Sequence, residues 1–257
     1  MTLGLVLAAL ALAVAGSGSR SAREQPVEAG AGTVGAPANA VPPTTLPLPP
    51  AFPVTTTAPP HRSLVATVKG PSIDVFDAPE APAPSRTLEN PRPSGADQVF
   101  LVVGRRGAWL DVMLPVRPNG STGWIRGQDV TLAGHDYSIV VELGAHKLTV
   151  FQGDGVFDEE TVGVGVANTP TPGGRFYTVE LFRSQKPAYG PYAYGLSGYS
   201  EVLYDFAGGD GQFGIHGTSD PSGLGSDVSN GCIRMSNEGI TRLAETLPIG
   251  VPVEIRA

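Results

Sequence analysis

Short apolar runs separated by glycine and proline fill residues 63–257, and this punctuation restricts the fold more than any other feature. The chain holds 34 glycines and 25 prolines, two residues that destabilise the interior of a helix. Many of the runs are rich in β-branched and aromatic residues and alternate apolar with polar positions, a pattern typical of short β-strands. The sequence therefore predicts a mainly β protein.

Residues 63–133 are predicted to form a small β domain. The strand candidates are LVATV, SIDVF, QVFLVVG, WLDVML, GWIR and DVTL. Asn119-Gly120 predicts a hairpin turn, because this pair tolerates the positive φ of tight hairpins. The run RRGAWLDVMLPVRPNGSTGWIRGQDV resembles the bacterial SH3-like domains found beside cell-wall enzymes. Two interpretations stay open for Trp109 and Trp124: packing inside a small barrel, or a surface that binds the cell wall.

Residues 136–257 are predicted to form a second, mostly β domain with one helix. YSIVVELGAHKLTVFQ indicates a hairpin that turns at residues 144–146, and later runs indicate further strands. Four apolar residues repeat with the spacing of one helix face: Ile240, Leu243, Ala244 and Leu247. Ser236 or Asn237 can cap the start of this helix, and Pro248 with Gly250 ends it.

Residues 1–15 are predicted to be a signal peptide or a membrane anchor. The apolar run from Leu3 to Ala15 is shorter than the roughly 20 residues that a spanning helix needs. Ala13-Val14-Ala15 fits a small-x-small cleavage pattern, although no basic residue precedes the run. Residues 16–62, with the Pro/Thr-rich stretch VPPTTLPLPPAFPVTTTAPP, are predicted to form a disordered tether. We therefore expect an extracytoplasmic location, secreted or membrane-anchored.

The charge balance bears on possible partners. Lys and Arg number 17 and Asp and Glu 24, which gives a formal net charge of −7 at pH 7. Nucleic-acid binding needs clustered Lys and Arg to displace counterions from phosphates, and this chain has no basic block. We expect no nucleic-acid partner.

The single cysteine, Cys232, lies in a Gly/Ser/Asp-rich loop after the strand-like FGIHG, which contains His216. A free thiol in an exported protein can mispair or oxidise, so its presence points to chemistry. A thiol has a pKa near 8.5, and an adjacent imidazole can activate it by taking its proton. Gly231 permits an unusual φ beside the thiol. Backbone N–H groups leading into the helix can stabilise a developing oxyanion.

Other interpretations of these residues are a buried cysteine that acts as a small apolar side chain and a zinc site. Zinc requires three or four protein ligands, whereas His61, His135 and His146 lie in distant segments. We expect no metal and no organic cofactor.

IHGT followed by SNGCIRM resembles the signature of the L,D-transpeptidase catalytic domain, also called the YkuD domain. The resemblance extends over residues 137–257 and includes IVVELGAHKLTVFQ, TPTPGGRFYTVE and GVPVEI. The expected fold is therefore mainly β, with a small SH3-like barrel followed by a YkuD-type β domain with one clear helix. By this resemblance Cys232 is the nucleophile, His216 is the base, and the carbonyl of Gly217 orients the imidazole.

The same resemblance suggests roles for the residues around the thiol. Gly231 and Cys232 would offer backbone donors to the oxyanion, and Ser229 belongs to the same oxyanion and substrate-binding segment. Arg234 would hold a substrate carboxylate or order the loop. Many family members have a second histidine where this chain has Asn230. Because an amide cannot take a proton, the base role falls to His216, and Asn230 is expected to have a structural or substrate-orienting role.

The activity implied by the resemblance is acyl transfer between peptidoglycan stem peptides, which are both donor and acceptor. A Cys thioester would be resolved by an amine to give a 3→3 cross-link, and carbapenem-type β-lactams would acylate the thiol. Three alternatives stay open: an L,D-carboxypeptidase that hydrolyses the same thioester, a transferase that attaches a protein to the stem, and a non-catalytic cell-wall-binding protein.

Overall fold

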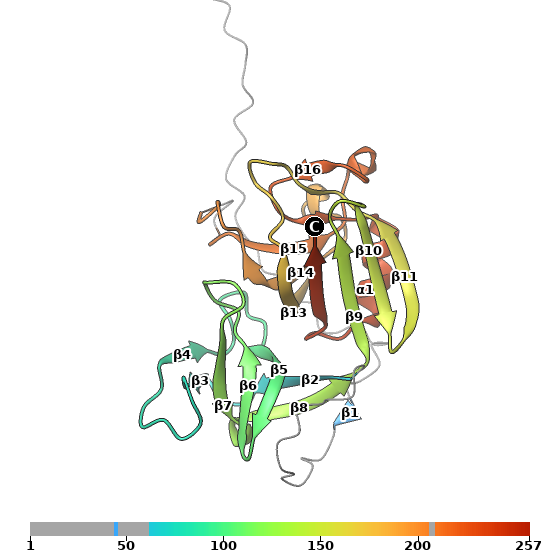
Figure 1. Ribbon diagram of the computed structural model, residues 1–257. Coiled ribbons are helices and arrows are strands. Elements are labelled where there is room, and N and C mark those ends of the chain that lie inside the picture. Colours follow the sequence, from blue (N-terminus) through green and yellow to red (C-terminus); the bar gives the residue numbers. More distant parts are fainter. Residues whose placement is uncertain (1–43, 46–61, 206–208) are drawn as a thin grey trace, which may run out of the picture.

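A computed structural model describes residues 44–45, 62–205 and 209–257 as two β-sheets joined to short pairings and one α-helix (Figure 1). The prediction of a mainly β protein with one helix is confirmed. The predicted signal peptide or anchor lies outside the described residues, as does the predicted tether apart from Thr44, Thr45 and Arg62. Within the described ranges, no helix has the length and apolar character needed to cross a bilayer.

The first sheet has six strands in the order β1-β8-β2-β5-β6-β7. Its strands are β1 (Thr44–Thr45), β2 (Ser63–Val68), β5 (Val99–Arg106), β6 (Trp109–Met113), β7 (Thr122–Arg126) and β8 (Val130–His135), with the 3₁₀ turn η1 (Gly127–Asp129) before β8. A separate hairpin joins β3 (Ser72–Val75) to β4 (Arg86–Glu89). All six predicted strands form, whereas β4 lies in a Pro-rich stretch for which no strand was expected. That this unit is an SH3-like barrel stays a prediction.

The second sheet has eight strands in the order β11-β10-β9-β18-β13-β14-β15-β17. They are β9 (Tyr137–Glu142), β10 (Lys147–Gln152), β11 (Gly155–Thr161), β13 (Gly174–Arg183), β14 (Tyr192–Tyr199), β15 (Gln212–His216), β17 (Ile233–Arg234) and β18 (Pro252–Arg256). Two short strands, β12 (Val164–Gly165) and β16 (Asp227–Ser229), pair in parallel beside it. The 3₁₀ turn η2 (Pro187–Tyr189) lies between β13 and β14. A second 3₁₀ turn, η3 (Pro221–Gly223), lies between β15 and β16.

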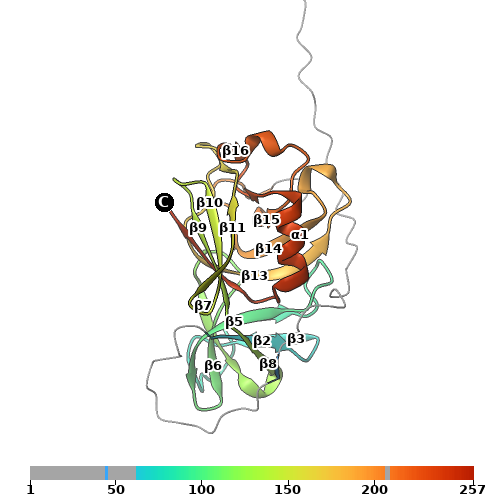
Figure 2. The same ribbon diagram turned by 90° about the vertical axis from the view of Figure 1, so that its right-hand side faces the viewer.

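Helix α1 (Asn237–Thr246) packs against β14 and β15 (Figure 2). Ser236 is the N-cap, because its hydroxyl accepts a hydrogen bond from the N–H of Gly239 at 2.9 Å. Ile240 and Leu243 lie on the predicted apolar face and are fully buried. The Tyr194 hydroxyl donates to the carbonyl of Leu243 at 2.9 Å, so β14 and the helix are joined by a polar contact inside an apolar core.

The two sheets pack directly on each other. Only Asp136 separates β8 from β9, and β8 extends two residues beyond the predicted end of the first domain at residue 133. An apolar cluster spans the contact: Val65, Val99, Leu101, Met113, Tyr177 and Val179. Within it the buried Tyr177 hydroxyl donates to the carbonyls of Val99 at 3.1 Å and Met113 at 3.2 Å. Core packing and hydrogen bonds therefore fix the sheets relative to one another.

The predicted turn at Asn119-Gly120 forms, with φ of +80° at Gly120, and it also belongs to this contact. The Asn119 amide donates to the carbonyl of Tyr199 at 2.8 Å and accepts from its N–H at 2.9 Å. Next to it the Arg117 guanidinium donates to the carbonyl of Ser200 at 2.6 Å and lies over the Tyr199 ring, 4.9 Å from its centroid. The β6–β7 connection is therefore bound to the end of β14.

Tyr177→Phe tests the contact between the sheets. The substitution keeps the ring and removes the hydroxyl, which leaves two inward-facing carbonyls without this donor. We expect the free energy of unfolding, measured by urea denaturation, to fall by about 1–3 kcal/mol. The matched control is Tyr204→Phe, at a side chain that is 68% exposed, where we expect a change within about 0.5 kcal/mol. Equal stabilities of the two variants would contradict the interpretation.

Candidate active site

Strand pairing brings the predicted histidine and cysteine segments together. β15 and β17 are parallel neighbours, with Ile215 opposite Ile233 and His216 opposite Arg234. Ile215 and Ile233 are fully buried in the core, and side chains alternate along a strand, so His216 and Arg234 face the opposite side. Cys232 directly precedes β17, and the backbone of Gly214 in β15 hydrogen-bonds to its thiol. The thiol therefore lies beside the strand that ends at the imidazole.

His216 is a buried, neutral imidazole with a defined tautomer. Its Nδ1 lies 2.6 Å from the carbonyl oxygen of Gly217, and since a carbonyl only accepts hydrogen bonds, Nδ1 carries the proton. Nε2 is then the ring nitrogen that can accept another proton. Burial, opposed by the hydrogen bond to Gly217 and assisted by the charge of Arg234, lowers the pKa of His216 to about 4. The imidazole is therefore uncharged at neutral pH; the catalytic role of its contact with Gly217 stays a prediction.

Cys232 is partly buried. Burial raises the pKa of its thiol, and the hydrogen bond from the Gly214 backbone and the charge of Arg234 act in the opposite direction. A raised thiol pKa and a lowered imidazole pKa both favour the uncharged pair over a thiolate–imidazolium pair. Without a ligand, the site rests as thiol and neutral imidazole.

A tight turn at residues 229–232 presents the thiol. The buried Ser229 hydroxyl donates to the carbonyl of Cys232 at 2.5 Å and accepts from the N–H of Gly231 at 3.1 Å. Gly231 has a φ of +113°, which only glycine adopts readily. Asn230 is exposed, and its amide oxygen accepts from the Thr169 hydroxyl at 3.5 Å. Ser229 thus holds the turn, and an oxyanion would have to compete with it for the Gly231 donor.

Arg234 supplies positive charge next to the thiol and the imidazole. Its backbone N–H and carbonyl both bond to Gly163, at 2.8 Å each, which anchors the residue. Its Nε atom is buried and has no hydrogen-bond partner among the described residues. After the larger effect of burial, the guanidinium acts to lower the pKa of both His216 and Cys232. A buried donor without a partner, on a cation beside the thiol and the imidazole, suits a carboxylate.

Two residues at the site were not predicted from the sequence. The ring of Tyr189, at the end of η2, lies with its centroid 4.5 Å from that of His216. Burial raises the pKa of Tyr189, and the nearby Cys232 raises it further. Asn237 accepts a hydrogen bond from the N–H of Thr218 at 2.9 Å, and an added Cβ at Gly190 would collide with its side chain. Tyr189 thus covers the imidazole of His216. The only sequence signal for this cover is the Pro- and Gly-rich connection around Tyr189.

The histidines considered for zinc take other positions. His146 lies 2.8 Å from a carboxylate oxygen of Asp227, which joins the β9–β10 turn to β16. His135 accepts from the N–H of Tyr137 at 3.2 Å, and His61 lies outside the described residues. In the part of the chain that the structure describes, no group of three or more His, Cys, Asp or Glu side chains is arranged to hold a metal.

Comparison with known proteins identifies the family of the second half of the chain. Residues 136–255 match the family model of the L,D-transpeptidase catalytic domain, YkuD. The Bacillus subtilis protein named "Putative L,D-transpeptidase YkuD" is 32% identical over 149 residues, which cover 56% of this chain and 84% of that one. A protein of the same name from Bacillus licheniformis is 37% identical over 120 residues, which cover 46% of this chain and 65% of that one.

Solved structures similar to this chain include L,D-transpeptidase 3 from Mycobacterium tuberculosis in complex with a faropenem-derived adduct. The identity is 16%, the TM-score is 0.41, and the match covers 68% of this chain and 72% of that one. The family model covers the second sheet and its helix. The chain belongs to the YkuD family of L,D-transpeptidases.

The pH dependence of stability tests the burial of His216. In the unfolded chain the imidazole takes a proton near pH 6.5, but in the folded protein its pKa is about 4. The contribution of His216 therefore leaves the free energy of unfolding at its full value above about pH 6.5. As the pH falls from about 6.5 towards 4, the unfolded chain takes up a proton that the folded protein does not, and the free energy of unfolding falls by up to about 1.4 kcal/mol per pH unit. Urea unfolding at pH 7, 6 and 5 should show a steeper loss for the native protein than for His216→Gln, which cannot titrate. Parallel slopes would contradict a buried neutral imidazole.

Proposed function

We propose that this chain is a peptidoglycan L,D-transpeptidase that forms 3→3 cross-links through a thioester on Cys232. One observation carries the proposal. The single thiol lies beside the strand that ends at a buried, neutral imidazole, and the unprotonated Nε2 of that imidazole is available to take a proton. Membership of the family supports the choice of substrate.

Acylation starts from the uncharged pair. The Cys232 sulfur attacks the carbonyl carbon between the L-centred third residue and the fourth residue of a donor stem, while its proton passes to Nε2 of His216. The carbonyl electrons move onto oxygen, and the backbone N–H of Cys232 stabilises that oxyanion, with the Gly231 N–H as a second donor if it leaves Ser229. The C–N bond then breaks, the imidazolium returns its proton to the leaving D-alanine amine, and a thioester remains.

Deacylation repeats these steps with an acceptor. An amine of a neighbouring stem attacks the thioester carbon and loses a proton to His216. The new amide forms as the C–S bond breaks, and the imidazolium reprotonates the departing sulfur. Water in place of the amine would give the L,D-carboxypeptidase. A transient imidazolium is tolerated because Gly217 accepts a hydrogen bond from Nδ1 in both charge states.

The remaining predicted residues have supporting roles in the proposal. Arg234 binds a carboxylate of the donor stem, since its buried Nε has no partner in the described part of the chain. Asn230 orients the substrate from the rim of the turn, where it is exposed. The reaction takes place outside the cytoplasm, where the substrate is, and residues 1–15 direct export or anchoring.

Acylation by meropenem tests the nucleophile. Intact-mass analysis should show one adduct on the native protein and none on Cys232→Ala, because no other thiol is present. The donor tetrapeptide, incubated with and without an acceptor amine, then separates the alternatives by product mass: a cross-linked dimer supports the transpeptidase and a tripeptide alone supports the carboxypeptidase. An adduct on both proteins, or on neither, overturns the mechanism.

Two substitutions test the proposed base and the carboxylate site. His216→Gln should slow meropenem acylation by about 10²–10⁴-fold, the usual contribution of general-base catalysis. In the native protein the acid limb of this rate should lie near pH 4, where the pKa of the buried imidazole lies, and not near the ordinary value of about 6.5.

Arg234→Gln should raise KM for the donor tetrapeptide about 10–150-fold, because a charged hydrogen bond is worth roughly 1.5–3 kcal/mol. Arg234→Lys is the matched variant that keeps the charge, and its KM should lie between those of the native protein and Arg234→Gln. An unchanged KM in both variants would remove the carboxylate-binding role.

A further inference from the structure

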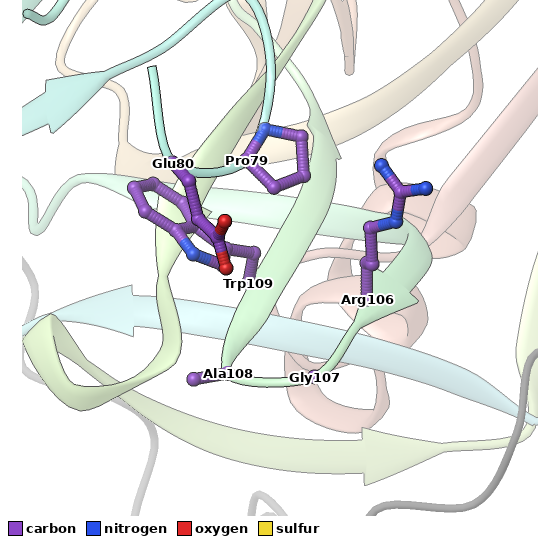
Figure 3. A pocket seen from close by; sticks show the side chains of 6 residues that line it. All are labelled: Pro79, Glu80, Arg106, Gly107, Ala108 and Trp109. Atoms are coloured by element: carbon purple, nitrogen blue, oxygen red, sulfur yellow. The ribbon is translucent and has the colours of Figure 1, made fainter. Parts of the chain in front are cut away.

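A concave site lies on the first sheet, away from the thiol. It is a hollow of about 450 Å³ lined by Pro79, Glu80, Arg106, Gly107, Ala108 and Trp109 (Figure 3). β5 and β6 contact the second sheet through Val99 and Met113, and the turn between Arg106 and Trp109 joins their other ends. The hollow therefore lies at the end of the first sheet that is remote from the second sheet.

The aromatic wall of this hollow is held rigidly. The rings of Phe76 and Trp109 meet edge to face with centroids 5.0 Å apart. The Arg126 guanidinium lies 4.7 Å from the Phe76 centroid and 5.4 Å from that of Trp109. Trp109 remains partly exposed despite these contacts. A fixed, partly exposed indole is a ready surface for an apolar group of a ligand.

Charges of opposite sign lie on two sides of the hollow. Figure 3 shows the Glu80 carboxylate beside Trp109 and the Arg106 side chain across the hollow. Both residues are exposed, and neither forms a salt bridge with any residue that the structure describes. The two charges are thus available to a ligand that carries an ammonium and a carboxylate.

The backbone at Glu80 is strained in a way that favours a functional role. The N–H of Ala81 donates to the carbonyl of Ala78 at 3.3 Å, which closes a turn with Pro79 second and Glu80 third. Glu80 has a φ of +63°, and glycine is the usual residue at a third turn position with positive φ. Residues held in this region of φ cluster at binding sites. The turn carries a carboxylate where local conformation favours glycine.

We propose that this hollow binds a peptide end that carries both an ammonium and a carboxylate, with Trp109 contacting its apolar part. That the peptide is a peptidoglycan stem rests on the proposed function. The wall polymer would then be held at two remote places on one rigid chain, one at Cys232 and one at Trp109.

Indole N–H signals of the ¹⁵N-labelled full chain test the proposal, because the protein has two tryptophans. Cys232→Ala prevents turnover, and Trp109→Phe assigns the signal. The tetrapeptide L-Ala-γ-D-Glu-meso-diaminopimelyl-D-Ala should shift the Trp109 signal and leave that of Trp124 in place. Glu80→Gly, which relieves the positive φ, and Arg106→Gln should each raise Kd about tenfold, equal to about 1.4 kcal/mol. The matched controls Glu89→Gln and Arg86→Gln remove the same charges from exposed positions on β4 and should leave Kd unchanged.

A Trp109 signal that does not shift when the tetrapeptide is added overturns the proposal. An unchanged Kd in Glu80→Gly and Arg106→Gln also overturns it. A shift caused by the N-acetylglucosamine tetramer but not by the tetrapeptide would assign the hollow to glycan and also overturn it. Meropenem acylation of otherwise native Glu80→Gly keeps the two proposals apart. A normal adduct on Cys232 in this variant, together with no peptide shift of Trp109 in Cys232→Ala, rejects the second site alone. A peptide shift of Trp109 in Cys232→Ala without any meropenem adduct on the native protein rejects the catalytic mechanism alone.

Discussion

The parallel pairing of β15 with β17 is the constraint on which the candidate active site depends. Ile215 and Ile233 lie opposite each other in the apolar core, so core packing sets the register of the two strands. The alternation of side chains then leaves His216 and Arg234 on the other face. A slip of one residue would turn the imidazole into the core and an isoleucine out of it. The geometry of the site is therefore stabilised by hydrophobic burial one residue away from each functional group.

Burial also determines the electrostatic state of the site. The imidazole and the thiol are both held uncharged, and the nearest cation, Arg234, lowers the pKa of each. An anionic ligand group that pairs with Arg234 would cancel part of this effect and raise the proton affinity of His216. Substrate binding and base strength are thus coupled through one guanidinium, while the cover formed by Tyr189 keeps water from the ring that it contacts.

Much of the fold and the central part of the site could be predicted from the sequence. Alternation and β-branched composition indicate most strands, and the i, i+3, i+4, i+7 spacing identifies α1. β4 and β14 escape these rules, since the first follows prolines and the second, YAYGLSGY, is interrupted by glycines. Tyr189 and Asn237 escape them as well, because their contacts join segments that become neighbours only after the sheet has formed. The lone Cys232 was informative because a thiol is rare in this composition, whereas tyrosine and asparagine are not.

The contact between the sheets has a consequence for dissecting the protein. Tyr177 and Val179 belong to β13 in the second sheet, yet their packing partners include Val65 and Val99 of the first. Excising residues 63–135 would leave these side chains on an open apolar surface and deprive the Tyr177 hydroxyl of both carbonyl acceptors. Residues 136–257 alone would therefore expose an apolar patch that favours aggregation. The boundary at residues 133–136 is thus a poor place to divide the protein, because both halves contribute to one apolar cluster.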